Sequence, residues 1–105
     1  MPLLARGISQ VAKLQEELNR LSHVKIPGVV KWRYTLGEDW TGDPAIFFWI
    51  ILTDAAAAGK LSATTSTFRK KVTDRIDFAN DWDLHPYFNF RSLSEQAMLK
   101  DEVYE

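Results

Sequence analysis

The 105-residue sequence contains no cysteine, so a disulfide framework, a thiol nucleophile and a cysteine-ligated zinc site are all excluded. A long apolar run is also missing. The longest one covers residues 45–52, whereas a helix needs about twenty apolar residues to cross a bilayer. The apolar patch before Arg6 is too short for the core of a signal peptide. These absences predict a cytoplasmic protein, most simply a bacterial one, that does not act at a membrane.

The most specific enzyme motifs are absent as well. The sequence has no glycine-rich phosphate loop, no His-Glu-x-x-His pair and no serine nucleophile elbow. We therefore expect no cofactor, and the sequence favours a non-enzymatic protein over an enzyme.

Neither sign of charge dominates, because 13 Lys and Arg face 14 Asp and Glu. The charges are nevertheless banded along the chain. Residues 1–36 carry a net +4, residues 37–59 a net −4, residues 60–75 a net +4 and residues 76–105 a net −5. Such segregation favours docking on a partner or pairing between elements, whereas the near-neutral total argues against a general nucleic-acid binder.

The composition, 46% hydrophobic and 26% charged, predicts a single globular domain over residues 1–105. Apolar residues recur at spacings of three and four over residues 8–22, which predicts an amphipathic helix. The expected buried stripe is Ile8, Val11, Leu14, Leu18 and Leu21.

Two strands are predicted next. Residues 29–36 alternate between apolar and polar side chains, as in a strand with one buried side. Residues 46–53 are apolar on both sides and rich in β-branched and aromatic residues, as in a strand covered on both faces. The segment GEDWTGDP, residues 37–44, is full of turn formers and predicts an antiparallel hairpin.

Pairing Leu36 with Ala45 is the register that we expect for this hairpin. Lys31 and Arg33 would then lie beside apolar residues of the second strand, on the face away from the core. We take both as candidate binding residues on a mixed basic and apolar surface. The other face would gather the aromatic side chains of both strands: Trp32, Tyr34, Phe47 and Trp49.

Asp54 is predicted to cap a short turn that Gly59 ends. A second helix begins among the serines and threonines of residues 62–67 and ends near Asn80. Its expected buried stripe is Phe68, Val72, Ile76 and Ala79.

Pro86 begins the third predicted strand, with phenylalanines facing the core at positions 88 and 90. Arg91 ends this strand just before a helix N-terminus, where free amides and the helix dipole attract anions. It could therefore complete a carboxylate or phosphate pocket, and an ion pair with a nearby acid is the alternative. The candidate binding residues on this side of the strand are Tyr87, Asn89 and Arg91.

Ser92 and Glu95 have the spacing of a capping box for the last helix. The predicted order of elements is thus α-β-β-α-β-α. The predicted class is α+β, with a small, mainly antiparallel sheet and helices packed on one face.

The hairpin loop offers acidic candidates and one aromatic candidate. Glu38, Asp39 and Asp43 could hold a hard cation, although their spacing does not match an EF-hand. Asp39 and Asp43 also suit a tight turn, in which carboxylates accept from nearby amides. Trp40 at the loop tip is a candidate for contact with a partner.

Asp81, Asp83 and His85 alternate along the chain. In an extended segment they would share one side and could ligate a transition metal or act as an acid and base. The same residues also fit the exit from a helix.

The segments GEDWTGDPA and YFNFRSLSEQ resemble a group of short uncharacterised bacterial proteins with a DWTGDPA-like loop and an FRS-x-SEQ ending. Some of these proteins sit in operons beside small helical toxin-type or nuclease-type partners. The likeness covers residues 37–99 and brings no established activity. It implies a family-defining surface made of Asp39, Trp40, Asp43, Arg91 and Glu95.

A non-enzymatic interaction protein, such as an antitoxin-like or accessory subunit, is the favoured function because it needs only an exposed docking face. A protein partner is expected, and a second copy of the chain is one candidate because residues 46–52 are apolar on both sides. The alternative is a small metal-dependent hydrolase or nuclease that uses Asp and His groups. Nucleic-acid binding on the open sheet face is less favoured because of the acidic bands, although Lys31, Arg33 and Tyr87 would support it.

Overall fold

The computed structural model describes the backbone of residues 8–105 and the side chains of residues 11–105. It confirms the α+β class and the order α-β-β-α-β-α. The elements are α1 (Ile8–Ser22), β1 (Val29–Glu38), β2 (Pro44–Leu52), α2 (Asp54–Gly59), α3 (Leu61–Arg75), α4 (Phe78–Trp82), β3 (His85–Ser92), α5 (Leu93–Leu99) and the 3₁₀ helix η2 (Glu102–Tyr104).

The first helix has the predicted bounds, and three leucines of its stripe are buried. The burial expected for Ile8 falls outside the described side chains. No helix within residues 8–105 combines the length and the apolar character needed to cross a membrane.

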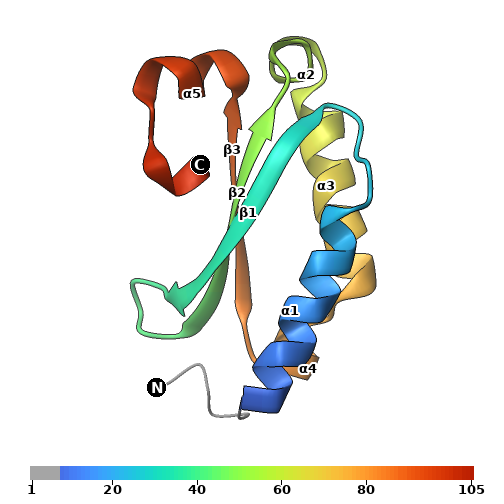
Figure 1. Ribbon diagram of the computed structural model, residues 1–105, viewed down its shortest axis with the longest axis vertical. Coiled ribbons are helices and arrows are strands. Elements are labelled where there is room, and N and C mark those ends of the chain that lie inside the picture. The colour runs from blue at the N-terminus through green and yellow to red at the C-terminus, as the bar shows by residue number, and fades with distance from the viewer. Residues whose placement is uncertain (1–7) are drawn as a thin grey trace.

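The three strands form one sheet in the order β1-β2-β3. β1 and β2 are antiparallel, whereas β3 runs parallel to β2. The sheet is therefore mixed rather than mainly antiparallel. The reason is the connection after β2: α2, α3 and α4 carry the chain back along the sheet, so β3 starts at the same end as β2 (Figure 1).

The predicted hairpin register is wrong by one residue, because Leu36 pairs with Ile46. The loop is shorter than expected, since pairing continues to Glu38 and Pro44. Gly42 has a φ of +86°, which fits a three-residue loop in which a left-handed residue follows a type I turn. A slip of one residue moves every side chain of β2 to the opposite face of the sheet.

Phe48 and Ile50 therefore face the core in place of Phe47 and Trp49. The side chain of Phe48 is completely buried. Its ring centroid lies 5.0 to 6.1 Å from those of four other rings, which are Trp32, Phe68, Phe78 and Phe88. Helices α1, α3 and α4 cover this face of the sheet (Figure 1).

The second helical region is broken rather than continuous. α3 begins at Leu61, before the predicted caps, and ends where Ile76 becomes extended. α4 then starts after Asp77, whose side chain accepts from the N–H of Asn80. The break changes the helical phase, so Ala79 is exposed instead of buried.

The cap of α2 also differs from the prediction. Thr53, and not Asp54, accepts the N–H of Ala56 (3.1 Å). Asp54 instead accepts from the backbone and the hydroxyl of Ser94, which ties α2 to the first turn of α5. The capping box that was predicted at the start of α5 is confirmed.

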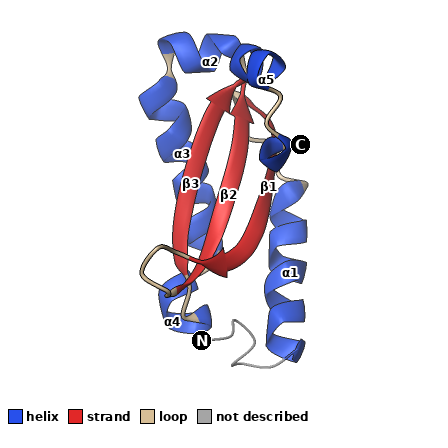
Figure 2. Cartoon of the chain, turned by 90° about the vertical axis from the view of Figure 1, so that its left-hand side faces the viewer, coloured by secondary structure: helices blue, strands red, loops and turns tan. Residues whose placement is uncertain are grey.

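α5 and η2 lie on the sheet face opposite to α1 and α3 (Figures 1 and 2). Helices are therefore not confined to one face as predicted. Ile51 of β2 is almost completely buried at this end of the sheet. The lower part of the same face carries no helix in the described chain (Figure 2).

Candidate interaction surface

Four aromatic side chains follow one another on the sheet face opposite the core. We call them the aromatic row: Trp40 of the hairpin loop, Tyr87 of β3, and Phe47 and Trp49 of β2. Successive ring centroids lie 5.9, 5.4 and 6.2 Å apart. These separations are those of attractive aromatic pairs.

The row follows from the sheet register. Phe47 and Tyr87 occupy paired positions of β2 and β3, and their rings stack at an interplanar angle of 18°. Trp49 is two residues further along β2, on the same side, and its indole N–H donates to Thr35 of β1 (3.1 Å). All three rings are half-buried, whereas Trp40 is 84% exposed.

Asp39 fixes the loop that carries Trp40. Its Oδ1 accepts from the backbone N–H of Thr41 (2.9 Å), from the hydroxyl of Thr41 (2.6 Å) and from the N–H of Asp43 (3.1 Å). Its Oδ2 accepts from the hydroxyl of Tyr87 (2.7 Å). The loop is thus attached to β3, and the indole is held over the end of the sheet.

These hydrogen bonds change the acidity of both partners. The hydroxyls of Thr41 and Tyr87 stabilise the carboxylate, which lowers the pKa of Asp39 to about 2. The hydrogen bond to Asp39 in turn raises the pKa of Tyr87. Asp39 and Asp43 were candidate binding residues, and both serve the turn, since Asp43 also accepts from the hydroxyl of Thr41 (3.1 Å).

The chain itself covers the other end of the row. Tyr104 of η2 is buried and meets Trp49 edge-on at 5.5 Å. The guanidinium of Arg91 lies 4.3 Å from the centre of the Tyr104 ring, close enough for a cation–π contact. The burial of Tyr104 raises its pKa.

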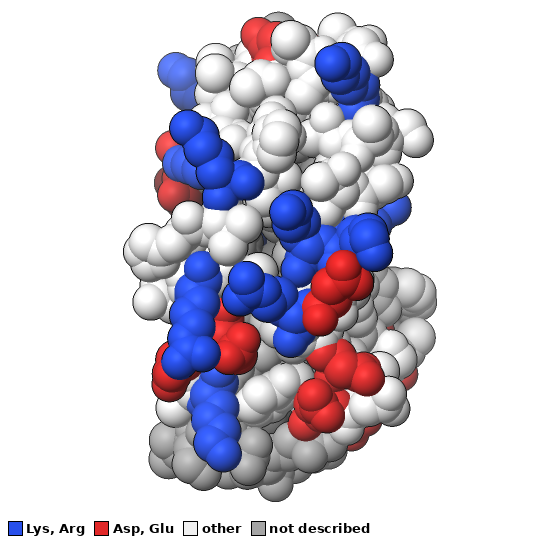
Figure 3. All heavy atoms as spheres, turned by 90° about the vertical axis from the view of Figure 1, so that its right-hand side faces the viewer, with Lys and Arg blue, Asp and Glu red and all other residues white. Residues whose placement is uncertain are grey.

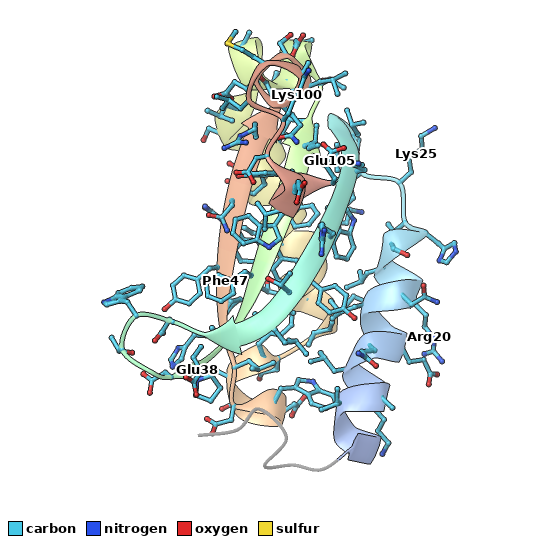
Figure 4. The ribbon with its side chains drawn as sticks, turned by 60° about the vertical axis from the view of Figure 1, so that its left-hand side comes forward. Arg20, Lys25, Glu38, Phe47, Lys100 and Glu105 are labelled. Carbon is cyan, nitrogen blue, oxygen red and sulfur yellow. The ribbon has the colours of Figure 1, made fainter. Side chains whose placement is uncertain are left out.

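Gln96 holds this C-terminal segment in place. Its side-chain oxygen accepts from Arg91 (3.1 Å), and its Nε2 donates to the main-chain oxygen of Asp101 (2.7 Å) and to the carboxylate of Glu105 (2.6 Å). The buried amide therefore has partners on both sides. Figure 4 shows Glu105 beside β1 and Lys100 at the outer end of the segment.

Arg91 and Asn89 make their hydrogen bonds within the chain. Arg91 also forms an ion pair with Asp101 (3.5 Å). Of the two roles predicted for Arg91, an anion pocket or an ion pair with a nearby acid, the structure thus shows the ion pair. Asn89 donates to the main-chain oxygen of Phe48 (3.2 Å). Both residues thus support the packing beside the aromatic row.

Lys31 and Arg33 are exposed on β1. Arg33 pairs with Trp49, so it stands directly beside the aromatic row. Lys31 is next to the C-terminal segment, and its amine donates to the main-chain oxygen of Glu105 (3.4 Å). The structure therefore places the two predicted basic residues and the predicted aromatic residues Trp40 and Tyr87 along one face.

The acidic candidates do not form a metal site. Within the described residues, no group of three or more His, Asp and Glu side chains could hold a metal ion. Asp81 lies in α4, Asp83 has a φ of 55°, and His85 begins β3. The segment is thus not extended, and the three side chains do not lie on one side as predicted.

Phe47, Trp49 and Tyr104 are parts of this surface that the sequence prediction did not assign to it. The wrong register sent Phe47 and Trp49 to the core. The glycine at position 42 was the signal for the shorter loop and hence for the correct register. No sequence pattern indicates that Tyr104 packs on Trp49.

Comparison of the chain with protein-family models, with curated proteins and with solved structures finds no match in any of the three. The function is therefore inferred from the geometry of the aromatic row and its surroundings.

Proposed function

We propose that the chain is a non-enzymatic interaction subunit that docks a partner protein on the aromatic row. The observation that carries the proposal is the position of Trp40. Its indole is 84% exposed and lies at the end of a continuous row whose other members are only half-buried.

The packing of Tyr104 on Trp49 indicates how a partner would bind. The chain uses its own C-terminal segment to cover one end of the row with an aromatic ring and a guanidinium. The uncovered end presents the same kind of surface to a side chain of another protein. Trp, Tyr and Arg are the residues that most often anchor protein interfaces. Trp40 and Tyr87 contact each other at the uncovered end of the row, and Arg33 lies beside Trp49 at the other end.

The helix-covered side of the molecule has a different character. Lys and Arg side chains gather over the middle of that face, with Asp and Glu beside them (Figure 3). Two exposed ion pairs lie on this side, Arg20 with Glu16 on α1 and Lys70 with Asp74 on α3. In each pair the two residues are one helical turn apart. Such mixed pairs are typical of a solvated helix surface.

The resemblance to operon-encoded bacterial proteins suggests where to search for the partner. We propose an accessory or antitoxin-like role in a bacterial cytoplasm, with the product of a neighbouring gene as the bound protein. A second copy of the chain is the other protein that could cover the row.

Single-stranded nucleic acid is the second candidate ligand, and the aromatic row is the observation that favours it. Bases stack on neighbouring aromatic side chains of open sheets, and Arg33 next to Trp49 could contact a phosphate. The carboxylates of Asp39 and Asp43 below Trp40 oppose this reading, since they would repel the backbone of a nucleic acid.

Co-expression of the chain with the product of each neighbouring gene tests the proposal. Size-exclusion chromatography with light scattering should reveal a complex with one of them. Trp40→Ser should weaken that complex at least about thirtyfold, because a Trp anchor contributes roughly 2 kcal/mol or more. The matched control is Lys70→Ser, on the exposed side of α3, which should change the dissociation constant less than about twofold.

Titration with a fluorescent oligothymidylate separates the two ligands. Salt-sensitive binding of the oligonucleotide that Trp40→Ser and Arg33→Ser both weaken would favour the nucleic acid over the protein. A complex that Trp40→Ser and Lys70→Ser weaken equally would contradict a docking site on the aromatic row.

A further inference from the structure

A groove runs along the free edge of β1, on the side away from β2. Two adjoining cavities form it. One has a volume of about 350 Å³ between α1 and β1, and the other has a volume of about 390 Å³ beside the segment that joins them. Ser22 and Trp32 line both cavities. Together they are in the size range of sites that bind small molecules or short peptides.

Within residues 8–105, the sheet leaves hydrogen-bonding groups of β1 unpaired along this groove. The N–H of Asp39 donates to the main-chain oxygen of Asp43 (2.9 Å) at the end of the hairpin. In an antiparallel pair, every second residue exchanges hydrogen bonds with the partner strand. Counting back from Asp39 in steps of two, Thr35 and Arg33 therefore direct their N–H and C=O groups toward β2. The intervening residues point theirs toward the groove: Trp32, Tyr34 and Leu36.

The side chains around the groove set the chemistry of a ligand. Its floor is apolar beside the segment that joins α1 and β1, where Val24, Ile26 and Val29 line it, whereas Gln15, Asn19 and Ser22 of α1 line the other part. Its rim is basic: Lys25 projects from the segment before β1 (Figure 4), and Arg33 lines the cavity next to α1. Among the described residues, neither of these two cations forms an ion pair.

Arg20, the nearest cation on α1, is already neutralised by Glu16 (2.7 Å) and Glu17 (3.1 Å). The positive charge that faces the groove therefore comes from Lys25 and Arg33, together with Lys31, whose amine also donates to the main-chain oxygen of Glu105 (3.4 Å). Opposite charges on neighbouring strands attract and like charges repel. Pairing with the β1 edge of a second copy would bring these same cations together, so an acidic strand fits this edge better.

We propose that the groove binds an acidic, extended peptide segment of a partner protein, which adds to the sheet as a fourth strand beside β1. Strand addition at a free edge supplies main-chain hydrogen bonds, and side-chain pockets supply the selectivity. Because side chains alternate along a strand, one side of the peptide faces Lys31 and Arg33 and the other faces the apolar floor. The preferred sequence therefore alternates between acidic and apolar residues. Arg33 borders both the groove and the aromatic row, but binding of the peptide at the outer edge of β1 does not depend on the function of the row.

A fluorescein-labelled seven-residue peptide that alternates Val and Glu tests the inference by fluorescence polarisation. We expect saturable binding, and no binding of a peptide with Lys in place of Glu. A peptide with N-methylated alternate amides retains its charges but cannot pair with β1, so it should also fail to bind. In hydrogen exchange, the bound peptide should slow the amides of Trp32, Tyr34 and Leu36, while Arg33 and Thr35 stay unchanged.

Two charge reversals of equal size provide the matched variants. Arg33→Glu should raise the dissociation constant about tenfold, because it replaces an attractive cross-strand pair with a repulsive one. Lys71→Glu, on the exposed side of α3, should leave it within about twofold. Trp40→Ser should have no effect on the peptide, which separates this site from the aromatic row.

Three results would overturn the inference. The first is the absence of saturable binding of the Val-Glu peptide. The second is equal binding of the N-methylated peptide, since this would mean that charge alone holds it. The third is a dimer in light scattering that Arg33→Glu dissociates, which would make a second copy of the chain the occupant of the edge.

Discussion

A methyl group added at Gly28 should destabilise the fold through two separable effects. The residue has a φ of +84°, a backbone conformation that residues with a side chain rarely adopt. An added Cβ would lie 2.9 Å from the Cβ of Ala56 in α2 and 3.0 Å from the Cγ2 of Thr64 in α3. Both neighbours are buried. We expect Gly28→Ala to lower the free energy of unfolding by about 2–5 kcal/mol, of which about 1–2 is backbone strain and about 1–3 is overpacking.

Gly42→Ala is the matched control for this prediction. Gly42 has nearly the same φ, +86°, but an added Cβ would meet nothing within 4 Å. The control should therefore lose only the backbone term, about 1–2 kcal/mol. Urea denaturation followed by circular dichroism measures both variants. Equal losses in the two would refute the close packing of the start of β1 against α2 and α3.

Four further predictions concern the core, the C-terminal segment and, in two variants, the loop. Phe48→Ala should cost about 3–5 kcal/mol in urea denaturation, because the ring is completely buried among four others; a loss below about 1 kcal/mol would return Phe48 to the open face. Gln96→Leu removes three hydrogen bonds that hold residues 96–105, while those from Ser94 to Asp54 remain, so hydrogen exchange should accelerate in residues 96–105 and not in the sheet. Unchanged exchange would contradict the role of Gln96 in holding this segment. Tyr87→Phe should raise the pKa of Asp39 from about 2 toward its ordinary value in an NMR titration. The pKa of Asp39 is lower in the folded state than its value of about 3.9 in the unfolded state. The stability that Asp39 contributes is therefore fully present at a pH above about 3.9 and is lost as the pH falls toward 2. Asp39→Asn should therefore reduce the difference between the urea midpoints at about pH 5 and about pH 2.5, and an unchanged difference would contradict the assigned bonds.

The sequence was most informative where one physical effect dominates. The stripe of α1 and the alternation of β1 arise from burial of one side, so the bounds of α1 and the start of β1 followed from the periodicity, whereas β1 continues two residues beyond its predicted end at Leu36. The capping box at Ser92 is a local hydrogen-bond pattern and was equally readable. Trp40, Tyr87 and Arg33 were likewise identifiable as side chains that the core does not need.

The faces of β2 could not be derived from the sequence, because this strand is apolar on both sides. Only the register separates Phe48 from Phe47, and the register depends on the length of the loop. The break between α3 and α4 has a similar origin, since the apolar spacing through Ile76 continues across it. The position of Tyr104 is set by long-range packing on Trp49 and by Gln96, for which a single sequence carries no local signal.

Photo-crosslinking in cells that express the chain tests the central claim most directly. A benzophenone amino acid at position 40 keeps an aromatic group at the exposed end of the aromatic row, and the same group at position 70 reports on the helix-covered face. We predict a discrete protein adduct from position 40 and none from position 70. No protein adduct at position 40, an adduct with nucleic acid there, or equal adducts from both positions would contradict a protein-docking role for the aromatic row.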